Sequence, residues 1–385
     1  MTTIKVDTIV GSAGGTVNVL KSMNINGTAL SSSNTMGITI GTTEPSGTNS
    51  VGSYWFNTSN NKLHIYVGDG VGNGWTVINQ NALPPPWAGF SGVFVGGNSG
   101  GYSDTIQTIN IPAGSNAVDF GNLLADNKGI GIGAAQGGGR VVTAGGNTNG
   151  GSPKNRIGYV TVATPGNSTS FGLLTVARDH IAGSSSGTRA VWNGGTTNYS
   201  AGLLNRIDYN TIATTGNATD FGDVQNLAYY RGYLNSTTRQ VVGGGGTAGS
   251  NTAATNVMDY ITIATTGNST NFGSFVMGVR RQLAGVSDNV RGLFVGGRNA
   301  NSNNLNTMEY ITIATTGNAI NAAQLTAAAA QTCGCSDGVT GVIASATANA
   351  GTSNGTQKIN IATSGASTVF ATLLAGVYDL AATSG

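Results

Sequence analysis

Tyr260-Ile-Thr-Ile-Ala-Thr-Thr-Gly-Asn-Ser-Thr-Asn-Phe-Gly273 is one copy of a segment that occurs six times along the chain, at a spacing of about fifty residues. Each copy follows a hydrophobic run that ends in two glycines, although the last run lacks them. The six runs are Val93 to Gly97, Val141 to Gly146, Ala190 to Gly195, Val241 to Gly246, Leu293 to Gly297 and Val342 to Ala346. This period predicts that one supersecondary unit has been repeated, and it decides the fold class.

Each repeat contains four short segments with the composition of β-strands. Examples are Gln282 to Val286, Leu293 to Gly297, Met308 to Ala314 and, in the preceding repeat, the stretch around Phe272-Gly273. Four strands in about fifty residues are typical of a propeller blade. An open β-solenoid has shorter rungs, and a string of separate hairpins would expose unpaired edges throughout.

The first repeat lacks the strand that precedes the glycine pair in the others. That strand is present elsewhere as Gly129 to Ala135, Asp179 to Ser185, Gly232 to Ser236, Gln282 to Val286 and Gln331 to Ser336. No such segment precedes Val93, whereas an additional copy, Tyr378 to Thr383, follows the last repeat. We therefore predict an all-β protein in which the terminal strand completes the first of six blades and closes the ring, which removes an exposed edge.

Three segments of different pattern precede the repeats. Residues 1–40 contain short apolar pairs and turn signals, and we expect these attachment strands to be ordered by another subunit or a larger assembly. Residues 41–80 contain aromatic runs that predict a small three-stranded β-meander. Residues 81–90 include three consecutive prolines and form an extended linker, so the propeller is expected over residues 91–385.

The composition excludes several classes of partner. Charged residues make up only 8% of the 385 residues, and the formal net charge of +2 has no basic cluster behind it. Nucleic acids and anionic membranes need such a cluster, so we expect neither as a partner. The N-terminus lacks the pattern of a signal peptide, which predicts a product of the cytoplasm. Cys333 and Cys335 are two apart in one expected strand, so we interpret them as buried apolar side chains without a disulfide or a metal.

No arrangement of residues in the sequence indicates catalysis. His180 stands beside a carboxylate, but no Gly-x-Ser-x-Gly motif accompanies it, so we interpret it as a variable residue of a strand. Asp208, Asp259 and Glu309 occupy equivalent positions in three repeats, which favours a structural role over acid and base chemistry. The glycine-rich stretch Gly129 to Ala134 precedes no helix and is not a nucleotide-binding loop. We expect no enzyme activity and no cofactor.

The order of residues within a repeat resembles the kelch repeat. A glycine pair after a hydrophobic strand is followed by a tyrosine, then by an aromatic residue, then by a return segment that contains arginine. The tyrosines are Tyr159, Tyr209, Tyr260 and Tyr310, with none in the first and sixth repeats. Where kelch blades carry tryptophan, this chain has Phe120, Phe171, Phe221, Phe272, Ala322 and Phe370. The resemblance covers about residues 91–385 and implies a β-propeller.

Segments near the N-terminus resemble bacteriophage tail fibres and related virion proteins. These segments are Thr3-Ile-Lys-Val-Asp-Thr-Ile9, Asn24-Ile-Asn-Gly-Thr28 and Val51-Gly-Ser-Tyr-Trp-Phe-Asn-Thr-Ser-Asn-Asn-Lys-Leu-His-Ile-Tyr66. The resemblance implies a protein located in the virion whose N-terminal region contacts other virion proteins. It also implies an oligomer, often a trimer.

One face of the expected propeller carries loops that differ from repeat to repeat. The loop after the second strand of a blade and the connection to the next blade emerge on this face, whereas the turns opposite are short and similar. Variable loops on a rigid ring are suited to recognition, so we expect this face to bind a bacterial surface polysaccharide or protein. The alternative is that these loops are only solvated. The candidate binding residues are Tyr102, Tyr199, Tyr229, Tyr230, Arg231 and Arg298, with the tyrosines as stacking platforms.

Three functions follow from these features. The first is a phage appendage that attaches by its N-terminus and presents the propeller for recognition of the host surface, with a glycan as the expected receptor. The second is a purely structural virion protein, such as a head decoration or a tail adaptor. The third is a polysaccharide depolymerase, which the lack of paired carboxylates disfavours.

Overall fold

The computed structural model divides the chain into two compact units, Met1–Leu83 and Pro84–Gly385. The residues that it describes are 24–25, 28–29, 38–43, 45, 53–57, 62–68, 73–77, 89–125, 131–148, 152–198, 202–247, 253–346 and 353–384. Every regular element in these residues is a strand, which confirms the predicted all-β class. Over the same ranges, no helix is long and apolar enough to cross a membrane.

The first unit contains two small sheets. Strands β1 (Asn24–Ile25) and β2 (Thr28–Ala29) pair antiparallel. Strands β4 (Tyr54–Asn57), β5 (Lys62–Gly68) and β6 (Asn73–Val77) form the antiparallel meander expected from the aromatic runs. Strand β3 (Ile38–Gly41), which the sequence analysis did not foresee, adds a parallel fourth strand beside β4. The proline-rich linker lies outside the described residues.

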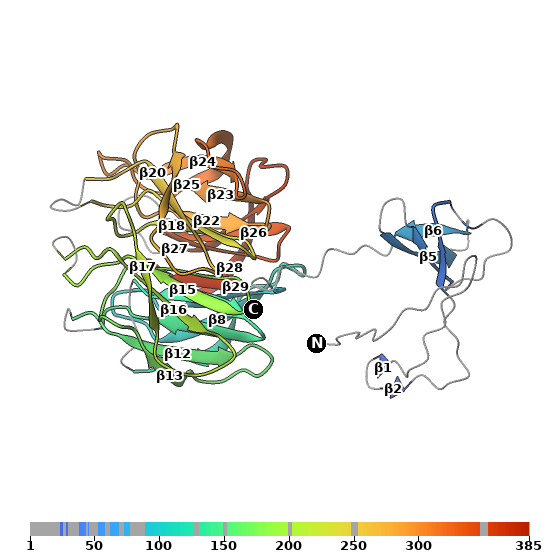
Figure 1. Ribbon diagram of the computed structural model, residues 1–385, viewed down its shortest axis with the longest axis horizontal. Helices are drawn as coiled ribbons and strands as arrows, with labels where there is room; N and C mark the ends of the chain where they lie inside the picture. Colours follow the sequence, from blue (N-terminus) through green and yellow to red (C-terminus); the bar gives the residue numbers. More distant parts are fainter. Residues whose placement is uncertain are drawn as a thin grey trace. The chain divides into compact units, whose positions relative to one another are not determined.

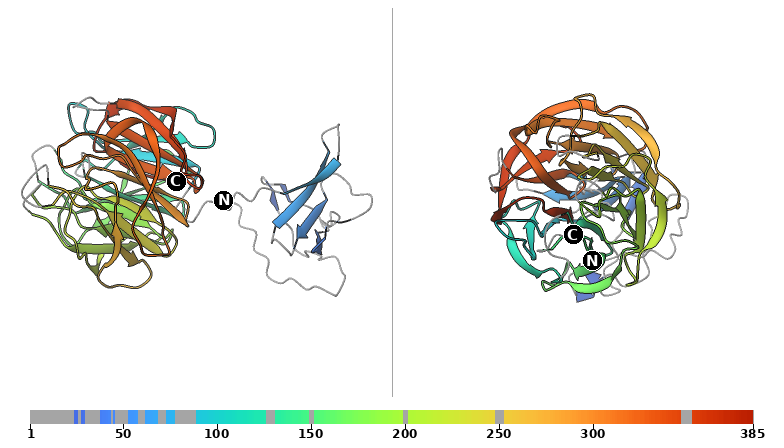
Figure 2. Two further views of the ribbon diagram at one scale, coloured as in Figure 1. Left: turned by 90° about the horizontal axis from the view of Figure 1, so that it is seen from above. Right: turned by 90° about the vertical axis from the view of Figure 1, so that its left-hand side faces the viewer.

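The second unit is built from sheets arranged around a common axis, which is the architecture of a β-propeller (Figure 1 and Figure 2). Four of its sheets have four strands each and one has seven. The first four-stranded sheet consists of β29 (Ala381–Ser384), β7 (Ser91–Val95), β8 (Thr105–Asn110) and β9 (Val118–Asn122), and the second of β10 (Gly133–Gly137), β11 (Arg140–Ala144), β12 (Arg156–Thr161) and β13 (Thr169–Leu173). The third consists of β14 (Ala182–Ser185), β15 (Arg189–Asn193), β16 (Arg206–Thr211) and β17 (Thr219–Asp223). The fourth consists of β18 (Gly232–Asn235), β19 (Arg239–Gly243), β20 (Val257–Thr262) and β21 (Thr270–Ser274).

The last two repeats depart from the prediction of six separate blades. Their strands belong to one seven-stranded sheet, made of β22 (Ala284–Ser287), β23 (Arg291–Val295), β24 (Leu305–Thr312), β25 (Ile320–Ser336), β26 (Thr340–Ala346), β27 (Ser353–Asn360) and β28 (Thr368–Val377). The physical reason is β25, whose 17 residues run on without a turn. The first part of β25 pairs with β24 and the last part pairs with β26. The alanine-rich sequence of this strand lacks the turn that separates the corresponding strands of the other repeats.

The end of the described chain lies in the first sheet of the propeller. Strand β29 pairs antiparallel with β7, from Ala381 opposite Val95 to Ser384 opposite Gly92. This is the place that the sequence predicted for the segment beginning at Tyr378. The strands nearest the axis contact one another in the order β29, β10, β14, β18, β22, β25 and back to β29. The contacts therefore close into a ring (Figure 2).

The hydrophobic core lies between neighbouring sheets. Trp192 on β15 is fully buried and packs in one cluster with Ala135 and Val142 of the preceding sheet. A second cluster joins Val93 of β7 to Val141 of β11 in the same way. Burial of a large apolar side chain contributes roughly 1.5–3 kcal/mol, so each sheet depends on its neighbours for its stability.

In four repeats, an arginine that stacks on a tyrosine of its own sheet also binds the neighbouring sheet. The guanidinium carbon of Arg189 lies 4.4 Å from the centroid of the Tyr209 ring, and this ring meets Phe221 edge-on at 5.9 Å. Arg189 also donates to the carbonyl oxygens of Ile263 and Ala264 in the next sheet, at 2.8 and 2.9 Å. Arg140, Arg239 and Arg291 repeat the stacking on Tyr159, Tyr260 and Tyr310. The arginines of these four repeats are therefore structural ties between neighbouring sheets.

An asparagine in five of the six repeated turns forms a second tie. Asn217 Oδ1 accepts the backbone N–H of Leu173 in the preceding sheet at 3.1 Å. Asn167, Asn268, Asn318 and Asn116 make the equivalent bond to Asn122, Asp223, Ser274 and Thr372. The bond from Thr372 to Asn116 joins the last sheet to the first, so this tie also crosses the closure of the ring.

Candidate functional site

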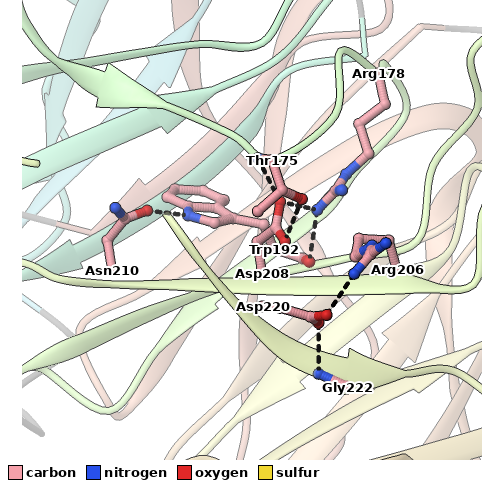
Figure 3. A network of polar contacts seen from close by, with 8 residues as sticks. All are labelled: Thr175, Arg178, Trp192, Arg206, Asp208, Asn210, Asp220 and Gly222. Atoms are coloured by element: carbon pink, nitrogen blue, oxygen red, sulfur yellow. Dashed lines mark hydrogen bonds and ion pairs between the residues drawn. The ribbon is translucent and has the colours of Figure 1, made fainter. Parts of the chain in front are cut away.

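Buried charged residues form one conspicuous polar network inside the propeller (Figure 3). Arg178 and Asp208 are both fully buried, and Arg178 Nη2 lies 3.1 Å from Asp208 Oδ2. Asp208 also accepts the backbone N–H and the hydroxyl of Thr175 at 3.1 and 2.7 Å, and Arg178 donates to the carbonyl oxygen of Trp192 at 3.1 Å. Burial lowers the pKa of Arg178, although Asp208 opposes that shift. The network ties the connection before β14 to strand β16.

Two other repeats contain the same kind of ion pair. Arg231 Nη2 lies 3.0 Å from Asp259 Oδ2, and Arg280 pairs with Glu309. These are the carboxylates that the sequence analysis assigned to a structural role, and each is fully buried against its arginine. In the first and sixth repeats the carboxylate is replaced by Gln107 and Gln357. The ion pairs therefore belong to the framework of the propeller, and the site has to be sought elsewhere.

Six residues, one from each repeat, surround the axis just before the innermost strands. They are Gly131, His180, Tyr230, Gln282, Gln331 and Asp379, and together they are called the axial ring here. All six have a positive φ, between 53° and 69°. Glycine adopts this conformation without cost, whereas other residues are strained there by about 1–3 kcal/mol. Five of the six positions keep a side chain in spite of that strain.

The side chains of the axial ring contact one another across the axis. Tyr230 donates its hydroxyl to Asp379 Oδ2 at 2.9 Å, and Gln331 Nε2 donates to the same oxygen at 3.2 Å. The His180 ring lies 4.0 Å from that of Tyr230, centroid to centroid, and its Nδ1 lies 2.8 Å from Asp179 Oδ1. The six residues line a cavity of about 70 Å³. Tyr230 and Gln331 are only half-buried, so the cavity reaches the surface beside them.

Two acceptors in this cavity have no hydrogen-bond partner among the described residues. They are Asp379 Oδ1 and Gln282 Oε1, and both residues are only 7% exposed. Burial raises the pKa of Asp379, while the nearby His180, Tyr230, Gln331 and Arg298 act in the opposite direction. A buried polar atom without a partner costs about 1–3 kcal/mol, and such atoms are rare in folded proteins. The axial ring therefore has unused hydrogen-bonding capacity on residues that line a cavity, as Gln136 Oε1 also does near the other end of the innermost strands.

The opposite end of the innermost strands is built differently. Five residues further along each strand stand Gln136, Ser185, Asn235, Ser287, Ser336 and Ser384, which are called the polar belt here. Side chains of the belt donate to the backbone carbonyl of the neighbouring strand, as Ser287 does to Asn235 at 2.8 Å and Ser336 does to Ser287 at 2.6 Å. Asn235 donates to Ser185 at 2.9 Å, and the hydroxyls of Ser185 and Ser384 donate to Gln136 and Ser336. These bonds link the strands around the axis.

The variable loops lie at the same end of the propeller as the axial ring. Isolated bridges join the residue before an innermost strand to the residue after the glycine pair, as between Asn98 and Tyr378 and between Arg281 and Arg298. The loops that follow the second strands therefore begin beside the connections that enter the innermost strands. This is the arrangement of loops that the sequence predicted for one face.

The predicted binding residues occupy different surroundings. Tyr102 is half-buried and bridges to Asn98 at the start of a variable loop. Tyr230 belongs to the axial ring, and Arg298 lies close enough to lower the pKa of Asp379, with its Nε bound to Asn304 at 2.9 Å. Tyr199 lies outside the described residues. The binding role of these four residues stays a prediction.

Two of the predicted residues are not exposed as stacking or contact groups would be. Tyr229 is only 1% exposed, because it lies against the glycine run that ends at Gly246, and its ring faces are covered. Arg231 is 7% exposed and its guanidinium is committed to Asp259. The sequence placed both on a surface loop, but they lie where the connection turns inward to the axis. Periodicity identified the connection, and it could not indicate where the chain turns from surface to core.

The sequence analysis missed the other members of the axial ring. His180 was interpreted as an ordinary strand residue, yet it precedes β14 and lines the cavity. Gln282, Gln331 and Asp379 were not singled out at all. Alignment of the repeats on their glycine pairs shows that this position varies, but the adjacent positions vary too and include Asp179, Arg231 and Arg281, so the variation alone does not single it out. The positive φ that the axial ring residues share cannot be derived from that variation.

The structure confirms that the two cysteines are buried side chains, as the sequence predicted. Cys333 and Cys335 are 6% and 4% exposed and are both free thiols in β25. Burial raises the pKa of both thiols, which keeps them protonated and unreactive at neutral pH. Among the described residues there is also no cluster of three or more ligands that could hold a metal ion.

Comparison with known proteins supports the fold. No family model matches the chain, and no curated protein matches it. Among solved structures, the chain is similar to one described as the structure of YjhT, with a TM-score of 0.56 and 9% sequence identity. The match covers 74% of this chain and 98% of that chain. Similarity at this level of identity concerns the β-propeller fold alone.

Proposed function

We propose that this protein is a recognition component of a bacteriophage virion, in which the propeller binds a carbohydrate on the host surface. The observation that carries the proposal is the coincidence of the variable loops and the axial ring at one end of the propeller. Binding sites are commonly placed on loops held by a rigid scaffold, and a cavity with a few convergent polar groups is the usual form of a small-ligand site. Neither feature requires catalysis, so we propose a binding protein and not an enzyme.

The location in the virion is proposed from the N-terminal resemblance to tail fibres. In this proposal the region before the propeller attaches to other virion proteins and forms an oligomer, a trimer in the simplest case. Several propellers on one particle would then act together, because linked sites raise the effective concentration of binding groups. Weak binding by each propeller is sufficient for stable attachment.

We also propose that the propeller is best counted as six kelch-like blades. The six innermost strands contact one another in a closed order, and β25 provides both the outer strand of the fifth repeat and the innermost strand of the sixth. In this interpretation the seven-stranded sheet is two blades that share one strand. Repeats of nearly equal length support the count.

A direct test is binding of the fluorescently labelled full chain to whole bacterial cells, with purified surface polysaccharides as competitors. We expect saturable binding that a polysaccharide of the right host inhibits. Tyr102→Ala, on the variable-loop face, should weaken the binding, whereas Thr266→Ala, an exposed residue of a short turn between a third and a fourth strand, should not. Absence of binding to any cell or polysaccharide would contradict the proposal.

One observation favours the structural alternative as a second candidate. Apolar side chains on the connections between repeats are exposed, with Val276 at 55% and Leu374 at 50%. Exposed apolar groups of this kind suit contact with another protein. In that case the propeller would dock to a virion protein, and the same cell-binding assay would give no signal.

A further inference from the structure

We propose that the cavity of the axial ring binds a protonated primary amine, such as the ammonium group of an amino sugar, through Asp379 Oδ1 and Gln282 Oε1. This inference rests on the proposed function, because it names the chemical class of ligand that the propeller would select at the host surface. Three parts of the site support it: the two unpaired acceptors, the strained backbone and the aromatic wall.

The first part is the demand for hydrogen-bond donors. Asp379 Oδ2 already accepts from Tyr230 and Gln331, whereas Asp379 Oδ1 and Gln282 Oε1 accept from no described residue. Both unpaired atoms are acceptors, and one belongs to a carboxylate. A hydroxyl group has a single donor, but an ammonium group has three donors and the complementary charge. An ammonium group therefore supplies the donors and the charge that these two acceptors lack, and the cavity of about 70 Å³ that their residues line has room for only a few non-hydrogen atoms.

The second part is the backbone of the axial ring. Asp379 and Gln282 have φ values of 54° and 58°, a region in which glycine is the unstrained residue. Gly131, at the equivalent position of another repeat, demonstrates that the fold does not need a side chain there. Strained non-glycine residues tend to occur where a side chain has a function.

The third part is the wall beside the acceptors. His180 and Tyr230 present aromatic rings to the cavity, with their centroids 4.0 Å apart. The negative face of the Tyr230 ring attracts cations, whereas His180 acts on Asp379 in the same direction as Arg298 and opposes the charge of the ligand. Of the arginines near the cavity, Arg231 is neutralised by Asp259, and Arg298 has its Nε bound to Asn304. The charge of Arg298 opposes that of the ligand, so we expect a dissociation constant in the millimolar range for a small amine, as befits a multivalent virion protein.

The test is calorimetric titration of the full chain with glucosamine, with glucose and N-acetylglucosamine as probes that lack the ammonium group. We expect saturable binding of glucosamine and at least a tenfold weaker response to the two neutral sugars. Methylammonium should compete with glucosamine. Equal binding of glucose and glucosamine, or no binding of either amine up to 100-fold above the expected millimolar range, roughly 0.1 M, would overturn the inference.

Two variants locate the binding. Asp379→Asn preserves the shape and the acceptor for Tyr230 and Gln331, but it presents an amide in place of the free carboxylate oxygen, so glucosamine affinity should fall at least tenfold. Gln282→Leu removes the second acceptor at similar volume and should weaken binding severalfold. Asp220→Asn is the matched control, since this carboxylate is half-exposed on the outside of the propeller and pairs with Arg206. Unchanged affinity of Asp379→Asn would contradict the assignment.

Different experimental results would reject the amine site and the proposed function. Cell binding that survives in Asp379→Asn would retain the recognition function and reject the axial amine site. Amine binding by the purified chain without any cell binding would retain the site and reject host recognition as its purpose.

Discussion

The two ends of the innermost strands differ in composition although they stand only five residues apart in each repeat. The polar belt consists mostly of serine, and five of its six side chains donate to the backbone of the neighbouring strand, whereas Gln136 Oε1 has no partner among the described residues. The axial ring carries a different side chain in most repeats, adopts a strained backbone and leaves two buried acceptors unpaired. A position that every repeat fills in nearly the same way serves the ring as a whole. A position that the repeats fill differently, at a cost in stability, is the better candidate for function.

The largest expected effect comes from deleting one segment that contributes a residue to the axial ring and another to the polar belt. Deletion of residues 378–385 removes Asp379 from the axial ring together with β29, which supplies Ser384 to the polar belt and pairs with β7. The first sheet would lose its innermost strand and expose the edge of β7, so we expect aggregation or loss of cooperative unfolding. Thermal melting and size-exclusion chromatography measure both. An unchanged melting curve would contradict the role of β29 in closing the ring.

Breaking a buried ion pair measures how strongly the stability of the framework depends on one interaction. Asp208→Asn leaves Arg178 buried without its partner and should lower the free energy of unfolding by about 3–5 kcal/mol. The double variant Arg178→Ala with Asp208→Gln copies the neutral pair Ala329 and Gln357 of the sixth repeat and should recover most of the loss. Denaturation in urea measures these values.

The control for Asp208→Asn is Asp220→Asn. Its exposed ion pair with Arg206 should be worth no more than about 1 kcal/mol. A loss for Asp208→Asn as small as that of the control would contradict the structural role of the buried pair.

A single change in the polar belt should have an intermediate effect. Ser336→Ala removes a buried hydroxyl that donates to Ser287 and accepts from the backbone N–H of Gly338 at 3.0 Å, so we expect a loss of about 1–3 kcal/mol. Binding of amines should not change. Ser170→Ala, at an exposed position of β13, is the matched control and should leave stability within about 0.5 kcal/mol.

The smallest effect should be a gain at the axial ring. Gln282→Gly relieves the strain of a φ of 58° and removes an unpaired buried acceptor, at the cost of some side-chain burial. We expect the free energy of unfolding to rise by up to about 1 kcal/mol while glucosamine binding weakens. A destabilised variant would indicate that Gln282 serves the framework, as the belt residues do.

The sequence predicted much of the framework and little of the axial ring. The period of about fifty residues predicted the strands, and the additional copy at Tyr378 to Thr383 predicted where the chain would return to the first sheet. The period also suggested six separate blades, because nothing in it revealed that β25 continues through the boundary of the fifth repeat. Strand patterns depend on local alternation, so they succeed where each strand is bounded by turns and fail where one is not.

The members of the candidate site depend on contacts that no local pattern contains. Tyr230 and Asp379 lie 149 positions apart in the sequence and meet only because the ring closes. Tyr229 is adjacent to Tyr230, yet the ring of Tyr229 is buried while that of Tyr230 lines the cavity. The sequence placed both on one variable face, and the direction of each side chain followed only from the positive φ at position 230.

The most direct test of the difference between the two ends compares the free energies of unfolding of Asp379→Asn and Ser336→Ala at several pH values. Burial raises the pKa of Asp379, so the folded state holds this proton more tightly than the unfolded state, and ionisation of the carboxyl costs stability as pH rises above about 4. His180, Tyr230 and Arg298, the titratable and charged groups near this carboxyl, are unchanged in the variant. The account predicts that Asp379→Asn is at least as stable as the natural chain at pH 7, that this advantage disappears below about pH 4, and that Ser336→Ala is destabilised at every pH. A loss of stability at pH 7 in Asp379→Asn as large as that in Ser336→Ala would contradict the account, because the axial ring would then be part of the framework.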